Sequence, residues 1–219
     1  MMAGRWRLLL AGARWRDRAV ACLGALAGIA ATAVTTRAAG LPLPAIVAPM
    51  GASAVLVFAV PASPLAQPWP VIGGNTLSAF VGIAAAVALG AGPLAAGVAV
   101  GAAILVMSIA RCLHPPGGAA ALTAVIGGPA VAAAGWRFAL APVALDSLIL
   151  VGCGVLFHRL SGHRYPHRAA PIPVPPRFLP QDIDVALAEA GEAFDIDRDD
   201  LAQLLAAAEA AADRRRAAG

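Results

Sequence analysis

The 219-residue chain contains no lysine and few charged residues of any kind. Charged side chains make up 13% of it, whereas a soluble domain carries about 25%. Between residues 19 and 157 only four charges occur: Arg37, Arg111, Arg137 and Asp146. So apolar a stretch excludes an ordinary soluble domain and predicts a polytopic membrane protein.

The sequence also lacks the patterns of common catalytic and metal sites. No Ser-His-Asp arrangement, phosphate-binding glycine loop or HExxH motif is recognisable. The three cysteines have no CxxC spacing and lie in apolar stretches, where we expect buried inert thiols: Cys22, Cys112 and Cys153. Three histidines after the last apolar stretch fit no zinc spacing and have arginine neighbours: His158, His163 and His167. We therefore predict no enzyme, no metal site and no cofactor.

The basic residues gather at the two ends of the apolar region. Residues 1–18 contain five arginines, and Arg159, Arg164 and Arg168 follow the last apolar stretch. A pI near 9.8 is compatible with nucleic-acid binding, but arginines that flank membrane spans are better explained by topology, so we expect no nucleic-acid partner. The positive-inside rule predicts that both termini are cytoplasmic and that the number of crossings is even. We expect the protein in a bacterial inner membrane.

The apolar region divides into four full spans and two shorter segments. We expect the full spans at residues 19–36, 75–91, 94–110 and 136–157. Prolines shorten the other two, so that one helix starts near Gly51 and the other covers residues 116–126. A helix that covers only residues 116–126 is too short to cross the hydrocarbon core of a membrane, which is about 30 Å thick. The fold class is an all-α polytopic helical membrane protein with two short broken or re-entrant helices, and either four or six crossings.

Beyond the membrane region the chain becomes polar. Residues 166–180 contain six prolines and predict an extended linker. The following residues predict two short helices, the first capped by Asp182 or Asp184 and ended by Gly191. The predicted organisation is a basic cytoplasmic segment (1–18), a transmembrane domain (19–165), the linker (166–180) and a helical cytoplasmic tail (181–219).

The run Arg-Cys-Leu-His-Pro-Pro-Gly-Gly-Ala at residues 111–119 places an imidazole and two helix breakers at membrane depth. Polar groups at that depth are costly and usually functional. A helix restarting after the prolines would direct free backbone N–H groups of Gly117, Gly118 and Ala119 at an anion, and His114 would bind or gate that anion or carry a proton. The alternatives are that His114 only caps the broken helix and that the glycines allow close helix packing.

A weaker echo of this motif occurs in the first half of the chain. The run Pro-Met-Gly-Ala-Ser-Ala at residues 49–54 resembles the part of the motif that starts at the second proline. Gly51, Ala52 and Ser53 would then form a matching half-site. Each half of the chain consists of a span, a broken short helix and a span, which is the pattern that points to the central site of a transporter. Three crossings per half would make the repeats inverted.

Three further polar residues are candidates for the site. Arg111 would attract anions, pair with Asp146 or snorkel to an interface. Unpaired, each of these two charges costs about 2.5–3.5 kcal/mol at a helix centre, so we expect pairing or a wet cavity. Asp146 is also a candidate proton site. Asn75 begins a span, where we favour a helix N-cap over a substrate ligand.

Four ordered motifs carry a resemblance to a known family. They are residues 51–56 (Gly-Ala-Ser-Ala-Val-Leu), 64–68 (Pro-Leu-Ala-Gln-Pro), 71–74 (Val-Ile-Gly-Gly) and 114–119 (His-Pro-Pro-Gly-Gly-Ala). Over about residues 14–166 the chain resembles the HPP family of integral membrane proteins. Some plastid and cyanobacterial members are nitrite transporters, and most bacterial members have no assigned substrate. The tail is similar to a segment that precedes paired CBS domains in some members; this chain stops before any, so we do not expect nucleotide sensing through that module.

We therefore predict transmembrane transport of a small inorganic anion, with nitrite as the best guess from the resemblance. Two broken-helix N-termini would meet near the midplane, where their partial positive charges would replace the water around the anion. The alternative is a membrane scaffold or sensor subunit that signals through its cytoplasmic tail. The expected partners are the lipid bilayer and the anion, and a homodimer would suit so small a membrane domain.

Overall fold

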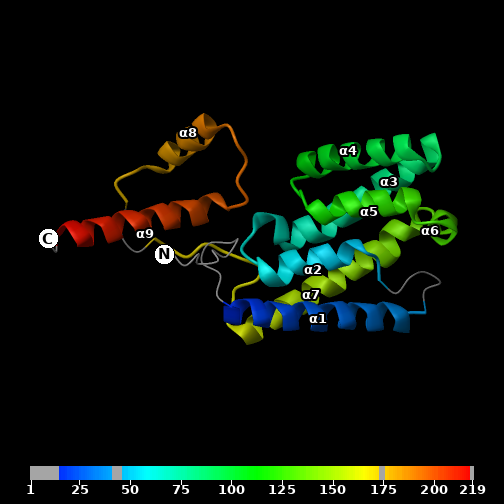
Figure 1. The fold of residues 1–219 in the computed structure, drawn as a ribbon, viewed down its shortest axis with the longest axis horizontal. Helices are drawn as coiled ribbons and strands as arrows, with labels where there is room; N and C mark the ends of the chain where they lie inside the picture. The colour runs from blue at the N-terminus through cyan, green and yellow to red at the C-terminus, as the bar shows by residue number, and fades with distance from the viewer. Residues whose placement is uncertain (1–14, 41–45, 173–175, 218–219) are drawn as a thin grey trace, which may run out of the picture.

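The computed structural model describes residues 15–40, 46–172 and 176–217, and every regular element within these ranges is helical. The all-α class is thereby confirmed. The membrane domain contains α1 (Trp15–Ala38), α2 (Pro49–Ala59), η1 (Pro64–Ala66), η2 (Pro70–Gly74), α3 (Asn75–Leu89), α4 (Pro93–Ile109), α5 (Pro115–Ile126), α6 (Pro129–Ala134), η3 (Ala139–Ala144) and α7 (Leu145–Ser161). The tail contains α8 (Pro180–Ala190) and α9 (Arg198–Ala217) (Figure 1).

Three stretches of the described chain are long and apolar enough to cross a membrane: Trp15–Ala38, Pro70–Leu89 and Ala139–Ser161. The second joins the π-helical segment η2 to α3, whereas the third has a kink at Ala141, whose φ of −143° and ψ of 116° are not helical, before it continues into α7. Helix α4 has 17 residues, which is about 26 Å at 1.5 Å per residue and close to the thickness of the hydrocarbon core. Helices α2 and α5 are shorter, with 11 and 12 residues.

Prolines and glycines set most of the helix boundaries. Proline occupies the first turn of α2, α4 and α5, where its missing N–H would have no helical partner. Helix α2 therefore begins at Pro49, slightly before the predicted start. The last span begins at Ala139 rather than at residue 136, because Gly135 takes a left-handed φ of 53° and ends the unpredicted helix α6.

The six apolar segments alternate in direction (Figure 1). Thr36 near the end of α1 bonds to Asp146 near the start of α7, so these neighbouring helices are antiparallel. Helix α2 ends at the loop that contacts the tail, whereas α5 begins beside that loop and runs away from it. Neither α2 nor α5 therefore forms a re-entrant segment that enters and leaves on the same side.

The two halves of the membrane domain pack in the same way. Helix α1 packs on α2 and α7, and α4 packs on α5 and α3. If α1 is matched with α4, α2 with α5 and α3 with α7, these two sets of contacts correspond. Because α2 and α5 run in opposite directions, the pattern is that of an inverted repeat.

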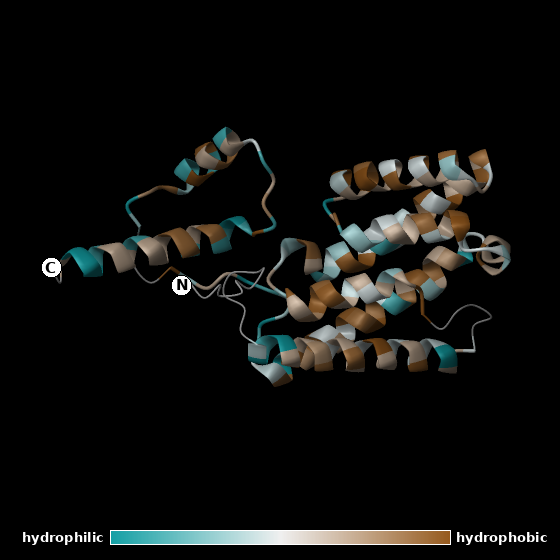
Figure 2. Cartoon of the chain, viewed as in Figure 1, coloured by the Kyte–Doolittle hydropathy of each residue, from teal (hydrophilic) through white to brown (hydrophobic). Residues whose placement is uncertain are grey.

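Apolar side chains cover the outside of the helical bundle, and small residues fill the helix contacts. Large exposed side chains such as Val87, Ile109 and Leu160 suit a lipid-facing surface. Inside, Gly82 of α3 lies so close to the backbone of Ala121 in α5 that a side chain would not fit. Figure 2 shows the apolar character of these helices and the polar residues concentrated in the tail.

The cysteines differ in their surroundings. Cys112 is buried and Cys153 is half-buried, whereas Cys22 is exposed on α1. The prediction of a buried thiol is therefore wrong for Cys22. The reason is that α1 packs against α2 and α7 and leaves its other face open, which the evenly apolar sequence of α1 does not reveal.

The tail folds as a pair of helices, as predicted. Asp182 accepts a hydrogen bond from the Leu179 N–H at the start of α8, and Gly191 ends that helix with a φ of 65°. Arg198 at the start of α9 donates to both oxygens of Asp184 in α8, at 2.6 and 2.7 Å. This carboxylate–guanidinium pair holds the two helices together.

A buried polar cluster at the start of helix α5

His114 immediately precedes α5, and its side chain is fully buried. Its ring bridges the two halves of the membrane domain. The Nδ1 atom lies 2.8 Å from the carbonyl oxygen of Leu65, and the Nε2 atom lies 2.8 Å from the hydroxyl oxygen of Ser53. His114 thus does not serve as a side-chain cap of α5, because both of its ring nitrogens bond to residues of the first half.

The partners determine the tautomer of the His114 ring. A carbonyl oxygen can only accept, so Nδ1 carries the proton and donates to Leu65. In the neutral ring Nε2 then accepts from the Ser53 hydroxyl. The Ser53 oxygen in turn accepts from the amide nitrogen of Asn75 at 3.1 Å. The result is a directed chain of hydrogen bonds from Asn75 through Ser53 and His114 to Leu65, assigned from the network as a whole.

Asn75 connects α3 and α7 to this chain of hydrogen bonds. Its amide nitrogen also donates to the hydroxyl of Ser147 at 3.3 Å, and Ser147 donates to the Val143 carbonyl at 2.8 Å. Asn75 is not the N-cap that we predicted, because η2 and α3 form one continuous helix and residue 74 is already helical. The side chain is therefore free to bond across the bundle.

Two buried polar atoms near this chain have no partner among the described residues. They are the amide oxygen of Asn75 and the hydroxyl of Ser78. Ser78 lies against the start of α5, because its hydroxyl would be 2.8 Å from a Cβ added to Gly117. An unsatisfied buried polar group costs about 1–3 kcal/mol. The two atoms offer one acceptor and one hydroxyl to a small polar molecule.

The start of α5 does not present the free N–H groups that we predicted. The two prolines have no N–H, and the Gly117 N–H donates to the His114 carbonyl at 2.8 Å. Gly117 instead permits close packing, since an added Cβ would meet Met107 at 2.8 Å and the Gly74 carbonyl at 2.9 Å. Gly118 is only half-buried and Ala119 is exposed. The three residues therefore do not line one buried site.

The predicted half-site on α2 is corrected in the same way. Ser53 is buried against His114, but Gly51 and Ala52 are exposed. The Gly51 N–H donates to the Ala48 carbonyl at 3.0 Å, so it is not free. Each helical residue is rotated by about 100° from the last, which places Ser53 inside and its two predecessors outside. The two helix N-termini do not converge, and a side-chain contact joins the halves instead.

Asp146 and Arg111 are not partners. The carboxylate of Asp146 is fully buried and accepts from the Thr36 hydroxyl at 2.7 Å. Its second oxygen has no partner among the described residues. Arg111 is exposed at the turn between α4 and α5, with a left-handed φ of 53°. The pairing alternative is therefore wrong, and Asp146 is a buried acid adjacent in sequence to Ser147.

Sequence reasoning missed several members of this region. Leu65 contributes a backbone oxygen, which has no signature in a sequence. Ser78 and Ser147 were present only as isolated serines in apolar helices, and Thr36 as one of two threonines at a helix end. A hydroxyl within a span could have served as the signal, because such groups seek a partner when water is absent.

The fold and this interior define a class: a polytopic helical membrane protein whose two halves meet at a buried polar cluster. The family model for the HPP transmembrane region matches residues 11–166, and the chain belongs to this family. Two curated transmembrane proteins of Dictyostelium discoideum are similar, at 39% and 38% identity over 123 residues. The aligned region is 52% of this chain and 42% and 38% of those proteins, so the chain spans less than half of their length. No solved structure matches.

Proposed function

We propose that the protein carries a small inorganic anion across the membrane, with nitrite as the best candidate, and that the substrate passes the His114 cluster. The observation that carries the proposal is the 2.8 Å contact between Ser53 and His114. It joins a helix of the first half to a residue of the second in the interior of the bundle. Substrate sites of transporters with inverted repeats lie at such interfaces.

The buried polar groups support a polar substrate at this place. Polar residues within a membrane are rare and usually mark a substrate or ion pathway. Here Ser53, Asn75, His114 and Ser147 are all fully buried. The Ser78 hydroxyl, which has no partner in the described part of the chain, is a donor that suits an anion.

The chemistry of the ring provides a way to couple substrate and proton. When Nε2 of His114 takes up a proton, the ring becomes cationic and Nε2 turns from an acceptor into a donor. The Ser53 hydroxyl can then no longer donate to the ring, so its proton is available to an anion. Protonation would thus create a positive charge and release a donor at the same place. Asp146 is a second candidate proton site at a different position in the bundle.

Purified protein in liposomes tests this proposal through nitrite uptake. We expect Ser53→Ala to reduce uptake by about tenfold or more, since a hydrogen bond to a charged group contributes about 1.5–3 kcal/mol. Ser108→Ala is the matched control, because Ser108 is exposed on α4 and its hydroxyl donates to the Ile104 carbonyl of the same helix. Equal uptake by folded Ser53→Ala and by the control would count against a substrate path at the cluster.

A second candidate function rests on the tail. A scaffold or sensor subunit would signal through α8 and α9. The tail contacts the membrane domain through the Ser63–Asp195 hydrogen bond and the linker through the His167–Asp200 hydrogen bond. Absence of flux for nitrite, nitrate, chloride and formate from folded protein would favour this function over transport.

A further inference from the structure

The loop Pro61–Gln67 between α2 and η2 has contacts on two sides. On its inner side, the Leu65 carbonyl accepts the Nδ1–H of His114 at 2.8 Å. On its outer side, the Ser63 hydroxyl donates to Asp195 of the tail at 2.7 Å. The same Ser63 oxygen accepts from the Leu65 N–H at 3.1 Å. One hydroxyl therefore links the tail to the residue that holds the buried histidine.

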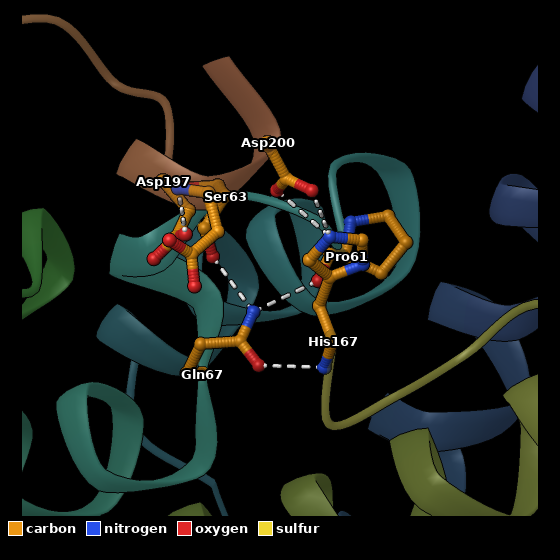
Figure 3. A network of polar contacts seen from close by, with 7 residues as sticks. Pro61, Ser63, Gln67, His167, Asp197 and Asp200 are labelled. Atoms are coloured by element: carbon orange, nitrogen blue, oxygen red, sulfur yellow. Dashed lines mark hydrogen bonds and ion pairs between the residues drawn. The ribbon is translucent and has the colours of Figure 1, made fainter. Parts of the chain in front are cut away.

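Gln67 and His167 reinforce this loop, as Figure 3 shows. The amide nitrogen of Gln67 donates to the carbonyls of Pro61 and Ser63 at 2.9 and 2.8 Å. Its amide oxygen accepts from the His167 N–H at 2.8 Å. The ring of His167 in turn lies 2.8 Å from the carboxylate of Asp200, in the first turn of α9. Gln67 thus fixes the shape of the loop and ties it to the segment that contacts α9.

The surface between tail and membrane domain is incompletely filled. A cavity of about 710 Å³ lies among the start of α1, the Pro61–Ser63 segment and α9, with Arg18, His163 and Leu204 in its wall. The side chains of His167 and Asp200 are 24% and 18% exposed. Among the described residues, the hydrogen bonds Ser63–Asp195 and His167–Asp200 hold the tail beside this cavity. Such an attachment is suited to reversible release.

We infer that the tail is a latch that keeps the buried cluster closed. In the docked state Ser63 is held by Asp195, Leu65 is held by Ser63, and His114 is held by Leu65, with His114 and Ser53 fully buried. Release of the tail removes the Ser63–Asp195 and His167–Asp200 restraints on the loop, and the Leu65 carbonyl then holds His114 less firmly. The hydrogen bond between His114 and Ser53 can open, and the substrate reaches the cluster. The role of the latch in regulating transport rests on the proposed function. The structural link from the tail to His114 is independent of that function.

The test uses the full chain with Asp195→Ala and Asp200→Ala combined. Asp213→Ala is the matched control, because Asp213 is an acid of α9 that pairs with Arg177 and Arg216 of the tail and not with the loop. Limited trypsin digestion reports tail release through faster cleavage at Arg168, which adjoins the Asp200 partner His167 and has no contact with Asp213. Nitrogen-15 spectra of the histidine rings report the tautomer of His114, whose signal is assigned by its loss in His114→Gln.

We expect the double variant to release the tail, to lose the pure Nδ1–H tautomer of His114, and to raise nitrite uptake by about fivefold or more, the lower range of coupling between sites. The control should match the wild type in all three. A tail that stays docked, or a released tail with an unchanged His114 signal, overturns the latch. A changed signal with unchanged nitrite uptake overturns its regulatory role. A changed signal in a protein that moves no nitrite in either form refutes the proposed function while the link to His114 stands.

Discussion

Ser53→Ala is the most informative perturbation of the buried cluster, because one oxygen atom serves two partners. The Ser53 hydroxyl is the acceptor for Asn75 at 3.1 Å and the donor to His114 at 2.8 Å. Without it, the Nε2 atom of His114 loses its partner altogether, whereas Asn75 retains its bond to Ser147. The substitution therefore leaves one buried nitrogen unsatisfied and weakens a second contact.

The expected loss of stability in Ser53→Ala follows from two estimates, one larger and one smaller. A buried polar group without a partner costs about 1–3 kcal/mol. Hydrogen bonds between membrane helices, however, contribute on average about 0.6 kcal/mol and at most about 1.7, because the unfolded state in a membrane also finds partners. We therefore expect Ser53→Ala to lower the free energy of unfolding by roughly 1–2 kcal/mol.

Equilibrium unfolding in mixed micelles by added SDS measures this loss. Ser108→Ala is again the control and should change stability by less than about 0.5 kcal/mol, as exposed sites do. A double-mutant cycle with His114→Gln isolates the pairwise contact and should yield coupling between the two sites. Equal stability of the two serine variants, together with no coupling in the cycle, would refute the hydrogen-bonded cluster.

Three further predictions concern the close packing of Gly117, the hydrogen bond of Tyr165 and the pairing of α8 with α9. Gly117→Ala should cost about 1–3 kcal/mol because its Cβ would press on neighbouring atoms, whereas Gly118→Ala, with only one atom within 4 Å, should be nearly neutral by the same SDS titration. Burial raises the pKa of the Tyr165 phenol, which stays neutral and donates to the Ala66 carbonyl at 2.9 Å; Tyr165→Phe should cost about 1 kcal/mol in that titration, and an unchanged midpoint would contradict the bond. The hydrogen bond from Arg198 lowers the pKa of Asp184 below its ordinary 3.8, so the pairing of α8 with α9 should stabilise the tail above that value and weaken as the pH falls through the lowered one. The protection factors of amides in α8, which remove the intrinsic pH dependence of exchange, should therefore fall in acid in the wild type, and Asp184→Asn should abolish that fall.

The sequence was a good guide to where the helices lie. Hydropathy and proline positions locate the spans because a membrane helix needs a long apolar run and proline is accepted mainly at a first turn. The tail was equally predictable, since Asp182 and Gly191 are local signals for the start and end of a helix. These features depend on neighbours in sequence, so a sequence displays them.

Which side of each helix faces the interior of the bundle could not be predicted. Helix α2 is apolar around its whole circumference, so its sequence does not indicate that Ser53 faces inward while Gly51 and Ala52 face outward. The predicted convergence of two helix N-termini failed for this reason. The prediction that Asn75 is an N-cap failed for a related reason. The π-helical segment η2 continues into α3, so no helix starts at this polar residue.

Contacts between distant segments were also out of reach. The Leu65 carbonyl binds His114 across 49 positions, and Ser63 bonds to Asp195 across 132. Leu65 and His114 each belong to a motif, but a motif does not indicate which backbone oxygen the histidine will bind, and Ser63 is a single serine outside the motifs. Only the fold reveals that one short loop touches both the buried histidine and the tail.

The central claim is that a small anion crosses the membrane at His114 with a proton. Nitrite uptake into proteoliposomes under an imposed pH gradient, compared between the wild type and His114→Gln, tests it most directly. The account predicts saturable nitrite uptake that increases with the gradient in the wild type and is lost in His114→Gln, while Ser108→Ala behaves as the wild type. Uptake that is equal in folded His114→Gln and the wild type, or that is absent from folded wild-type protein, would contradict the claim.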